Sequence, residues 1–148
     1  MSRVLGVDFG TVRIGLAISD PDRKFASPLA TYERRDSRQD AAYFTRLIAE
    51  EAIAQIAVGL PVHTDGREGH KAAEARAYGK WLEQMTGLPV VYYDERFTTV
   101  QAEELLWSAG LTDKKRKARR DQLAAQIMLQ AYLDAGCRAT ARPIALDE

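Results

Sequence analysis

Acidic residues stand at three boundaries between segments where a folded chain could bring them together. Asp8 follows the first apolar segment, Asp94-Glu95 follows the last one, and Asp121 lies in the first turn of the final predicted helix. In sheets that contain parallel strands, functional sites gather at the carboxyl ends of those strands. We therefore expect Asp8, Glu95 and Asp121 to converge at one edge of a sheet.

Three gathered carboxylates would suit a particular chemistry. Unpaired, they repel one another and raise one another's pKa values, which costs stability. Oxygen-rich clusters of this kind are preferred by Mg²⁺ and Mn²⁺. Two such ions about 4 Å apart can activate water and stabilise the leaving oxygen of a phosphodiester. His63 and His70 stand alone and Cys137 is the single cysteine, so no cluster supports zinc.

Each acid also has a purely structural interpretation. Asp8 stands before Phe9-Gly10 and could form an Asx-turn. Glu95 could support a helix cap begun by Thr98, and Asp121 could complement a helix dipole. For each residue alone the structural role is favoured. Their joint placement at strand ends and at a helix start favours a site.

The segment Leu111–Arg120 carries six basic residues and one acid, a net charge of +5 in ten residues. A solvated loop is one interpretation of such a run. Because Asp121 follows directly, phosphate binding is the other, since backbone phosphates need such cations. The basic residues of this segment are Lys114, Lys115, Arg116, Lys117, Arg119 and Arg120. Arg13, Arg96 and Lys71 could add to the same surface.

The whole chain is neutral, with 21 basic and 21 acidic residues among 148. Without Leu111–Arg120 the remainder holds 15 basic and 20 acidic residues, a net charge of −5. The neutral total therefore hides a polarised chain. It does not exclude nucleic acid as a partner.

Composition and length bound the class of protein. With 46% hydrophobic and 28% charged residues, the chain is typical of soluble globular proteins. Its length favours a single domain over 1–148, with a basic loop at 111–120 and a short tail from about 137 to 148. The lone Cys137 cannot form an intrachain disulfide. No apolar run approaches the roughly 18 residues of a membrane span, and no signal peptide is evident. We expect a cytoplasmic protein with no membrane partner.

The elements that would position the acids follow from the apolar pattern. Three segments of strand length, joined by short polar turns, predict an antiparallel meander over Arg3–Val7, Ile14–Ser19 and Ser27–Tyr32. Alternating segments then predict helices over 36–52 and 70–85, strands over 56–60 and 90–93, a helix from Thr98 and a last helix over about 120–135. Ala124 and Ala125 would let the last helix lie close to the sheet. Strand–helix–strand crossovers make strands parallel. The fold class is therefore α/β: a mixed five-stranded sheet with strands one to three antiparallel, strands one, four and five parallel, and helices on its faces.

Four blocks of sequence, in order, resemble the YqgF family. That family is described as Holliday-junction resolvases or pre-16S rRNA nucleases with a ribonuclease-H-like fold. The blocks are Asp8–Asp20, Gly59-Leu60-Pro61 with Asp65-Gly66, Asp94–Thr99 with Ala102, and Asp121–Ala125 with Leu129–Asp134. They span nearly the whole chain, and four blocks in order are far more specific than one.

The resemblance implies roles for individual residues. Asp8, Glu95 and Asp121 would be the metal-binding catalytic acids, with Mg²⁺ or Mn²⁺ as cofactor. Arg13, Arg96, Thr98 and Thr99 would help to hold the nucleic-acid backbone. Arg120 departs from the apolar residue expected there and thickens the basic patch. Related resolvases use four acids, and Asp94 and Asp20 are the candidates for the fourth.

The leading functional hypothesis is a hydrolase, a divalent-metal-dependent nuclease that cleaves structured nucleic acid. Processing of the 5′ end of pre-16S rRNA in ribosome biogenesis is favoured, and resolution of Holliday junctions in branched DNA is the alternative. Two other hypotheses are less favoured. One is a non-catalytic RNA-binding protein, and the other is a relative of actin-like ATPases, because Asp8–Thr11 also resembles the phosphate loop of those proteins. Those ATPases need a second lobe, for which 148 residues leave no room. The expected partner is an rRNA precursor, branched DNA or both, and the expected state is a monomer or homodimer.

Overall fold

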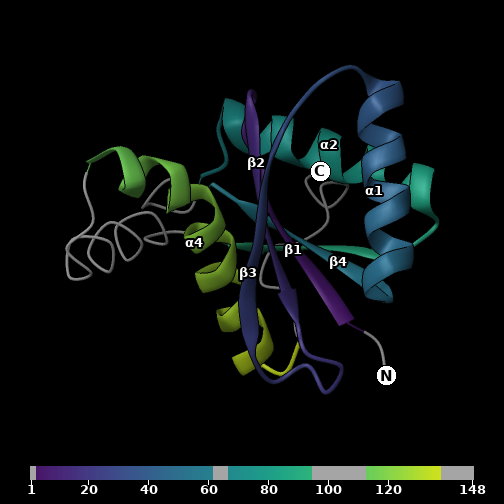
Figure 1. Cartoon of the computed structure of the whole chain (residues 1–148), viewed down its shortest axis with the longest axis vertical. Helices are drawn as coiled ribbons and strands as arrows, with labels where there is room; N and C mark the ends of the chain where they lie inside the picture. Colours follow the sequence, from purple (N-terminus) through teal and green to yellow (C-terminus); the bar gives the residue numbers. More distant parts are fainter. Residues whose placement is uncertain (1–2, 62–66, 95–112, 138–148) are drawn as a thin grey trace.

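A mixed sheet lies between two layers of helices (Figure 1). The computed structural model describes residues 3–61, 67–94 and 113–137, and for 113–118 it describes the helical backbone alone. The elements, in chain order, are β1 (Arg3–Asp8), β2 (Arg13–Ser19), β3 (Ala26–Glu33), α1 (Ser37–Glu51), β4 (Ile53–Leu60), α2 (His70–Thr86), β5 (Val90–Asp94) and α4 (Asp113–Asp134). No helix among the described ranges is both long enough and apolar enough to cross a membrane.

The order of strands across the sheet is β3-β2-β1-β4-β5. The first three strands are antiparallel, whereas β4 is parallel to both β1 and β5. The predicted meander and parallel crossovers are therefore confirmed. Because β1, β4 and β5 run in one direction, their carboxyl ends, with Asp8, Leu60 and Asp94, lie at the same edge of the sheet.

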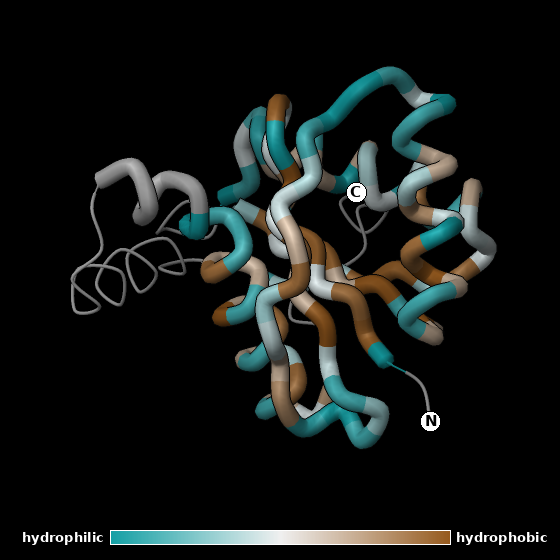
Figure 2. Tube along the Cα trace, viewed as in Figure 1, coloured by the Kyte–Doolittle hydropathy of each residue, from teal (hydrophilic) through white to brown (hydrophobic). Residues whose placement is uncertain are grey.

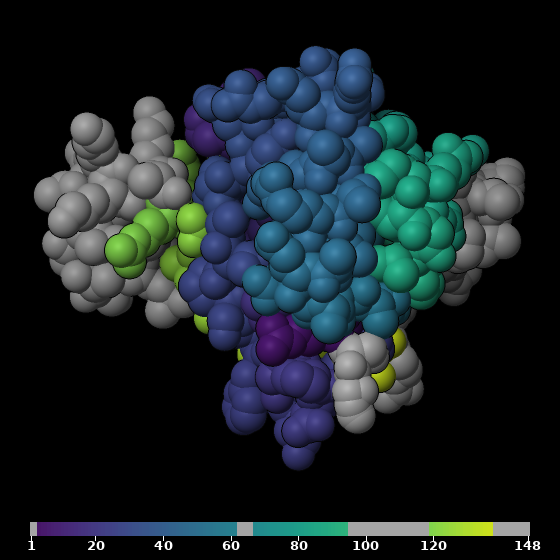
Figure 3. Space-filling model, turned by 45° about the vertical axis from the view of Figure 1, so that its right-hand side comes forward, coloured from purple at the N-terminus to yellow at the C-terminus, as the bar shows by residue number. Residues whose placement is uncertain are grey.

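Alternate residues of the strands supply two cores. On one face, Leu5 and Val7 of β1 pack with residues of α1 and α2, including Phe44 and Leu82. On the other face, Val4 of β1 packs against α4. Figure 2 shows apolar residues concentrated in the middle of the central strands, and Figure 3 shows α1 and α2 next to each other on one side of the molecule. The period of two in the strands thus decides which side chains reach which helix layer.

Helix α4 lies directly on β1 and β2 because two strand positions under it are glycines. A Cβ atom at Gly15 would overlap the backbone oxygen of Asp121. One at Gly6 would lie 3.0 Å from the Cβ atom of Leu129. Ala124 and Ala125 are buried at the same contact, as the prediction of a closely packed final helix requires.

The start of the last helix is a correction. The sequence predicted a basic loop at 111–120 and a helix from about Arg120, but α4 begins at Asp113, so residues 113–120 are helical. Lys, Arg and Ala are strong helix formers, and this segment has no glycine or proline to stop a helix. Helix propensity therefore outweighs the repulsion between like charges in this segment. The helix predicted from Thr98 and the tail 138–148 lie outside the described residues.

The two glycine contacts give a ranked test of this packing. We expect Gly15→Ala to lower the free energy of unfolding by about 1–3 kcal/mol, the scale of overpacking, because the new methyl group meets backbone that cannot rotate away. Gly6→Ala should cost less, since a shift of a few tenths of an ångström suffices there. Urea unfolding of both variants measures the difference. A Gly15→Ala protein as stable as the parent would contradict the close contact.

Candidate active site at the carboxyl edge of the sheet

Asp8 and Asp121 come together across β2. Along β1, Gly6 faces α4 and Val7 faces α1 and α2, so the alternation of the strand assigns Asp8 to the α4 face. Asp8 pairs in register with Gly15 of β2. The backbone of Asp121 lies against that same glycine. Two of the three predicted acids are therefore next to the same strand position, Gly15, at the carboxyl end of β1.

Arg13, predicted to hold nucleic acid, contacts one of these acids. Its Nε donates to Oδ2 of Asp121 at 3.2 Å, with 48% and 25% of the two side chains exposed. An ion pair this accessible adds about 0–1 kcal/mol to stability. Its main consequence is geometric, because it joins the start of β2 to α4 and holds a guanidinium beside the Asp121 carboxylate.

The third predicted acid, Glu95, lies outside the described residues, as do Arg96, Thr98 and Thr99. Within the described ranges no group of three or more His, Cys, Asp or Glu residues is placed to hold a metal ion. The convergence of Glu95 with Asp8 and Asp121 stays a prediction.

The basic segment precedes Asp121 along α4. Figure 1 shows these first turns, in green, extending away from the sheet. Arg119 is exposed and Arg120 is half-buried. The side chains of Lys114, Lys115, Arg116 and Lys117 are not among those described. The basic segment therefore forms the turns of α4 that precede Asp121 in the chain.

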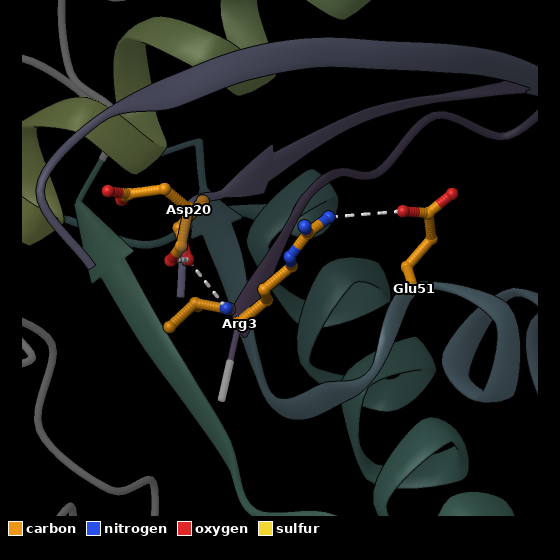
Figure 4. Close-up of polar contacts among 5 residues, drawn as sticks. Arg3, Asp20 and Glu51 are labelled. Carbon is orange, nitrogen blue, oxygen red and sulfur yellow. Dashed lines mark hydrogen bonds and ion pairs between the residues drawn. The ribbon is translucent and has the colours of Figure 1, made fainter. Parts of the chain in front are cut away.

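Of the two candidates for a fourth acid, Asp20 lies at the opposite end of the sheet, whereas Asp94 lies at the same edge as Asp8 but toward α1 and α2. Asp20 follows β2, which runs opposite to β1, and Figure 4 shows it near Arg3 at the start of β1. Its Oδ1 accepts hydrogen bonds from the backbone of Phe25 and Lys24, and these bonds hold the pKa of Asp20 below its usual value. Asp20 is thus a turn residue at the end of the sheet remote from Asp8.

Asp94 ends β5 in step with Val90 and Tyr92, which face α1 and α2. Hydrogen bonds from the buried Arg76 to Glu68, at 2.8 and 2.7 Å, hold the pKa of Glu68 below its usual value, and the nearby charge of Asp94 opposes that shift. Asp94 therefore belongs to a charged cluster on the face of the sheet opposite to Asp121.

A groove of about 300 Å³ opens beside Asp8. The turn between β1 and β2 forms one wall, and a Cβ atom at Gly10 would overlap the carbonyl oxygen of Arg13, so this turn needs glycine. Pro61, Lys71 and Glu74 complete the lining. Lys71, proposed from the sequence as a supplementary phosphate contact, is thereby placed in the same groove as Asp8.

Sequence reasoning missed Arg34, which braces this turn from behind. Its Nη1 donates to the carbonyl oxygen of Thr11 at 3.2 Å. Its guanidinium lies 5.0 Å from the ring centroid of Phe9 and 4.9 Å from that of Tyr78. The polar sequence around Arg34, residues 33–36, does not indicate these contacts. The partners lie far away in the chain, in the turn between β1 and β2 and in α2.

Comparison with known proteins identifies relatives along most of the chain. The family model described as RuvX, Holliday junction resolvase, matches residues 2–135. A protein of Rhodopirellula baltica named "Putative pre-16S rRNA nuclease" is 48% identical over 136 residues, which cover 92% of this chain and 78% of that protein. A protein of Rhodobacter capsulatus with the same name is 43% identical over 129 residues, covering 87% and 81%.

Solved structures share the fold. RuvC of Thermus thermophilus, in complex with a Holliday junction substrate, matches with a TM-score of 0.56 at 20% identity, covering 94% of this chain and 98% of that one. The fowlpox virus resolvase, in complex with Holliday junction DNA, matches with a TM-score of 0.58 at 12% identity, covering 92% and 99%. The predicted ribonuclease-H-like sheet is thus confirmed. The family match over residues 2–135 and the relatives above 40% identity show that the chain belongs to the RuvX family of nucleases.

Proposed function

We propose that this nuclease depends on a divalent metal, cleaves the pre-16S rRNA precursor in the cytoplasm and uses Asp8, Glu95 and Asp121 as its catalytic acids. One observation carries the proposal. The backbone of Asp121 lies on Gly15, the register partner of Asp8, so two carboxylates share the carboxyl edge of the sheet. The relatives named for pre-16S rRNA support the choice of substrate.

The donor chemistry of this edge fits Mg²⁺ or Mn²⁺. Its described acids offer carboxylate oxygens, the ligands that these hard ions prefer. The guanidinium of Arg13 beside Asp121 indicates that this position accepts positive charge. Asp8 and Asp121, with Glu95 as the proposed third ligand, would hold the ion. A bound divalent ion supplies activation of water and neutralises charge at the leaving oxygen.

The remaining residues would bind and orient the nucleic-acid backbone. Lys71 lines the groove beside Asp8, and the basic residues of α4 precede Asp121. Such contacts with phosphate give affinity and register without reading the sequence of bases. Arg96, Thr98 and Thr99 are proposed to join them.

Resolution of Holliday junctions is the second candidate. The description of the family and the two junction complexes with the same fold favour it. A four-way junction is symmetric, so this activity would suit a homodimer.

The role of Asp8 can be tested by a change that keeps its size and removes its charge. We expect Asp8→Asn to reduce the cleavage rate by about 100-fold or more, the scale on which loss of one electrostatic stabiliser acts. Binding of the nucleic acid should persist, because phosphate contacts supply most of the affinity. Gel-based cleavage with Mg²⁺ or Mn²⁺ and fluorescence anisotropy measure the two effects.

Asp20→Asn is the matched control. It makes the same chemical change at the opposite end of the sheet, so it should leave the cleavage rate within a few-fold of the parent. An Asp8→Asn protein that cuts as fast as the parent would refute the assignment.

Substrate choice is tested by offering a ribosomal RNA precursor, single-stranded RNA and a four-way DNA junction side by side. We expect the rRNA precursor to be cleaved fastest, with all cleavage lost in Asp8→Asn. Faster cleavage of the junction by the parent protein would favour the resolvase instead.

The basic turns of α4 make a prediction about salt. Neutralising Lys114, Lys115 and Lys117 to Gln should weaken nucleic-acid binding and flatten the plot of log K against log salt by about 2, since each phosphate contact contributes about 0.7–0.9 to the slope. A second triple variant, with Gln at Arg38, Arg46 and Lys80 on α1 and α2, changes net charge equally and should keep the original slope. Equal slopes in the α4 variant and the parent would exclude these lysines from the interface.

A further inference from the structure

A second cavity, of about 380 Å³, lies behind the turn between β1 and β2. It opens between the end of β3, the start of α1 and the middle of α2. Phe9, Thr11 and Glu74 line both this cavity and the groove beside Asp8. The two therefore adjoin, and the volume falls within the range of about 300–1,000 Å³ that small-molecule sites occupy.

Aromatic rings form one wall of this cavity. The ring of Tyr78 lies 5.0 Å from that of Phe9 and 5.1 Å from that of Trp81, measured between centroids. The guanidinium of Arg34 packs against the rings of Phe9 and Tyr78. Aromatic side chains and arginine planes are the surfaces on which unstacked bases pack.

Two polar atoms of this wall have no hydrogen-bond partner among the residues that the structure describes. These atoms are the hydroxyl oxygen of Tyr78, a residue that is only 8% exposed, and the Nε of Arg34. Both are buried without a hydrogen bond in the described part of the chain. Burial raises the pKa of Tyr78, so its hydroxyl keeps its proton and can donate. Buried donors without acceptors are rare in native proteins, and a ligand with acceptor atoms is one explanation for them.

Acceptors also line the cavity. Oδ1 of Asp40 is fixed by hydrogen bonds from the hydroxyl of Tyr32 at 2.7 Å and the backbone of Arg35 at 2.9 Å. Glu74 adds a second carboxyl group. Arg34 and Arg35 line the cavity together with these two carboxyl groups, a balance that gives a simple anion no advantage. A planar ligand with both acceptors and N–H donors matches the site.

We propose that this cavity holds an unpaired nucleobase of the nucleic-acid substrate, next to the phosphodiester bound beside Asp8. The inference rests on the proposed function. A base has apolar faces for the aromatic wall and N–H groups for the carboxyl groups of Asp40 and Glu74, and its ring acceptors would pair with the covered donors of Tyr78 and Arg34 when these turn into the cavity. Guanine carries all of these on one ring system. A free guanosine nucleotide has the same chemistry, so the test includes both sources.

The test measures binding without divalent metal, so it does not depend on cleavage. The probes are guanosine monophosphate, followed by NMR titration, and one RNA duplex prepared with and without a single bulged guanine, followed by fluorescence anisotropy. We expect the nucleotide to shift the resonances of residues lining the cavity. We expect the bulged duplex to bind more tightly than its paired counterpart.

Tyr78→Phe removes only the hydroxyl. It should weaken binding of the nucleotide and of the bulged duplex by about 3- to 10-fold, the usual worth of one hydrogen bond. The free protein should keep or raise its Tm, because an unpaired buried group is lost. Tyr43→Phe, which removes the same atom from a ring of α1 outside the cavity, should change neither binding nor selectivity for the bulge.

The outcomes separate this inference from the proposed function. If Tyr78→Phe binds both probes as the parent does, or if bulged and paired duplexes bind equally, the base site is wrong even where cleavage depends on Asp8. A lowered Tm with unchanged binding would assign Tyr78 to the fold alone and likewise overturn the site. Preserved base binding in a parent protein that cleaves no nucleic acid would refute the proposed function and leave the base site standing.

Discussion

The close contact of α4 with β1 and β2 is the constraint on which this edge of the molecule depends. Protein interiors are packed to near-crystalline density, so a helix approaches a sheet this closely only where side chains are missing. Gly6 and Gly15 provide that absence in the strands, and Ala124 and Ala125 provide small neighbours in the helix. The result is that Asp121 reaches the register partner of Asp8 without any intervening side chain. A larger residue at Gly15 would lift the helix and move the backbone of Asp121 away from the register partner of Asp8.

Much of the fold could be predicted because its signals are local. Short apolar segments between polar turns gave the meander, and crossovers gave the parallel strands. The start of α4 could not be predicted, since one run of Lys and Arg suits both a solvated loop and a helix. The placement of Asp20 at the opposite end of the sheet and of Asp94 on the face of α1 and α2 needed the direction of β2 and the pleat of β5, which only pairing fixes. Glu95 lies outside the described residues, so the structure gives positions for Asp8 and Asp121 but not for the third proposed acid.

The contacts that no sequence pattern indicated are those between distant segments. Arg13 and Asp121 are 108 positions apart, and no local rule joins them. Arg34 meets rings from the turn after β1 and from α2, so its importance appears only after the sheet and helices are assembled. Helical structure also changes the meaning of the basic segment. Cations in the first turns of a helix oppose its dipole, so the fold alone does not favour them there, whereas a phosphate nearby would.

Phe9 is the peptide neighbour of Asp8 and belongs to both cavities. Its ring packs on Tyr78 and under Arg34, while its backbone continues directly into the acid that ends β1. The cavity and the groove therefore share Phe9 as a lining residue, and a substitution at this position affects both. A smaller residue there would loosen both the aromatic wall and the segment that holds Asp8, so one substitution at Phe9 would alter both cavities.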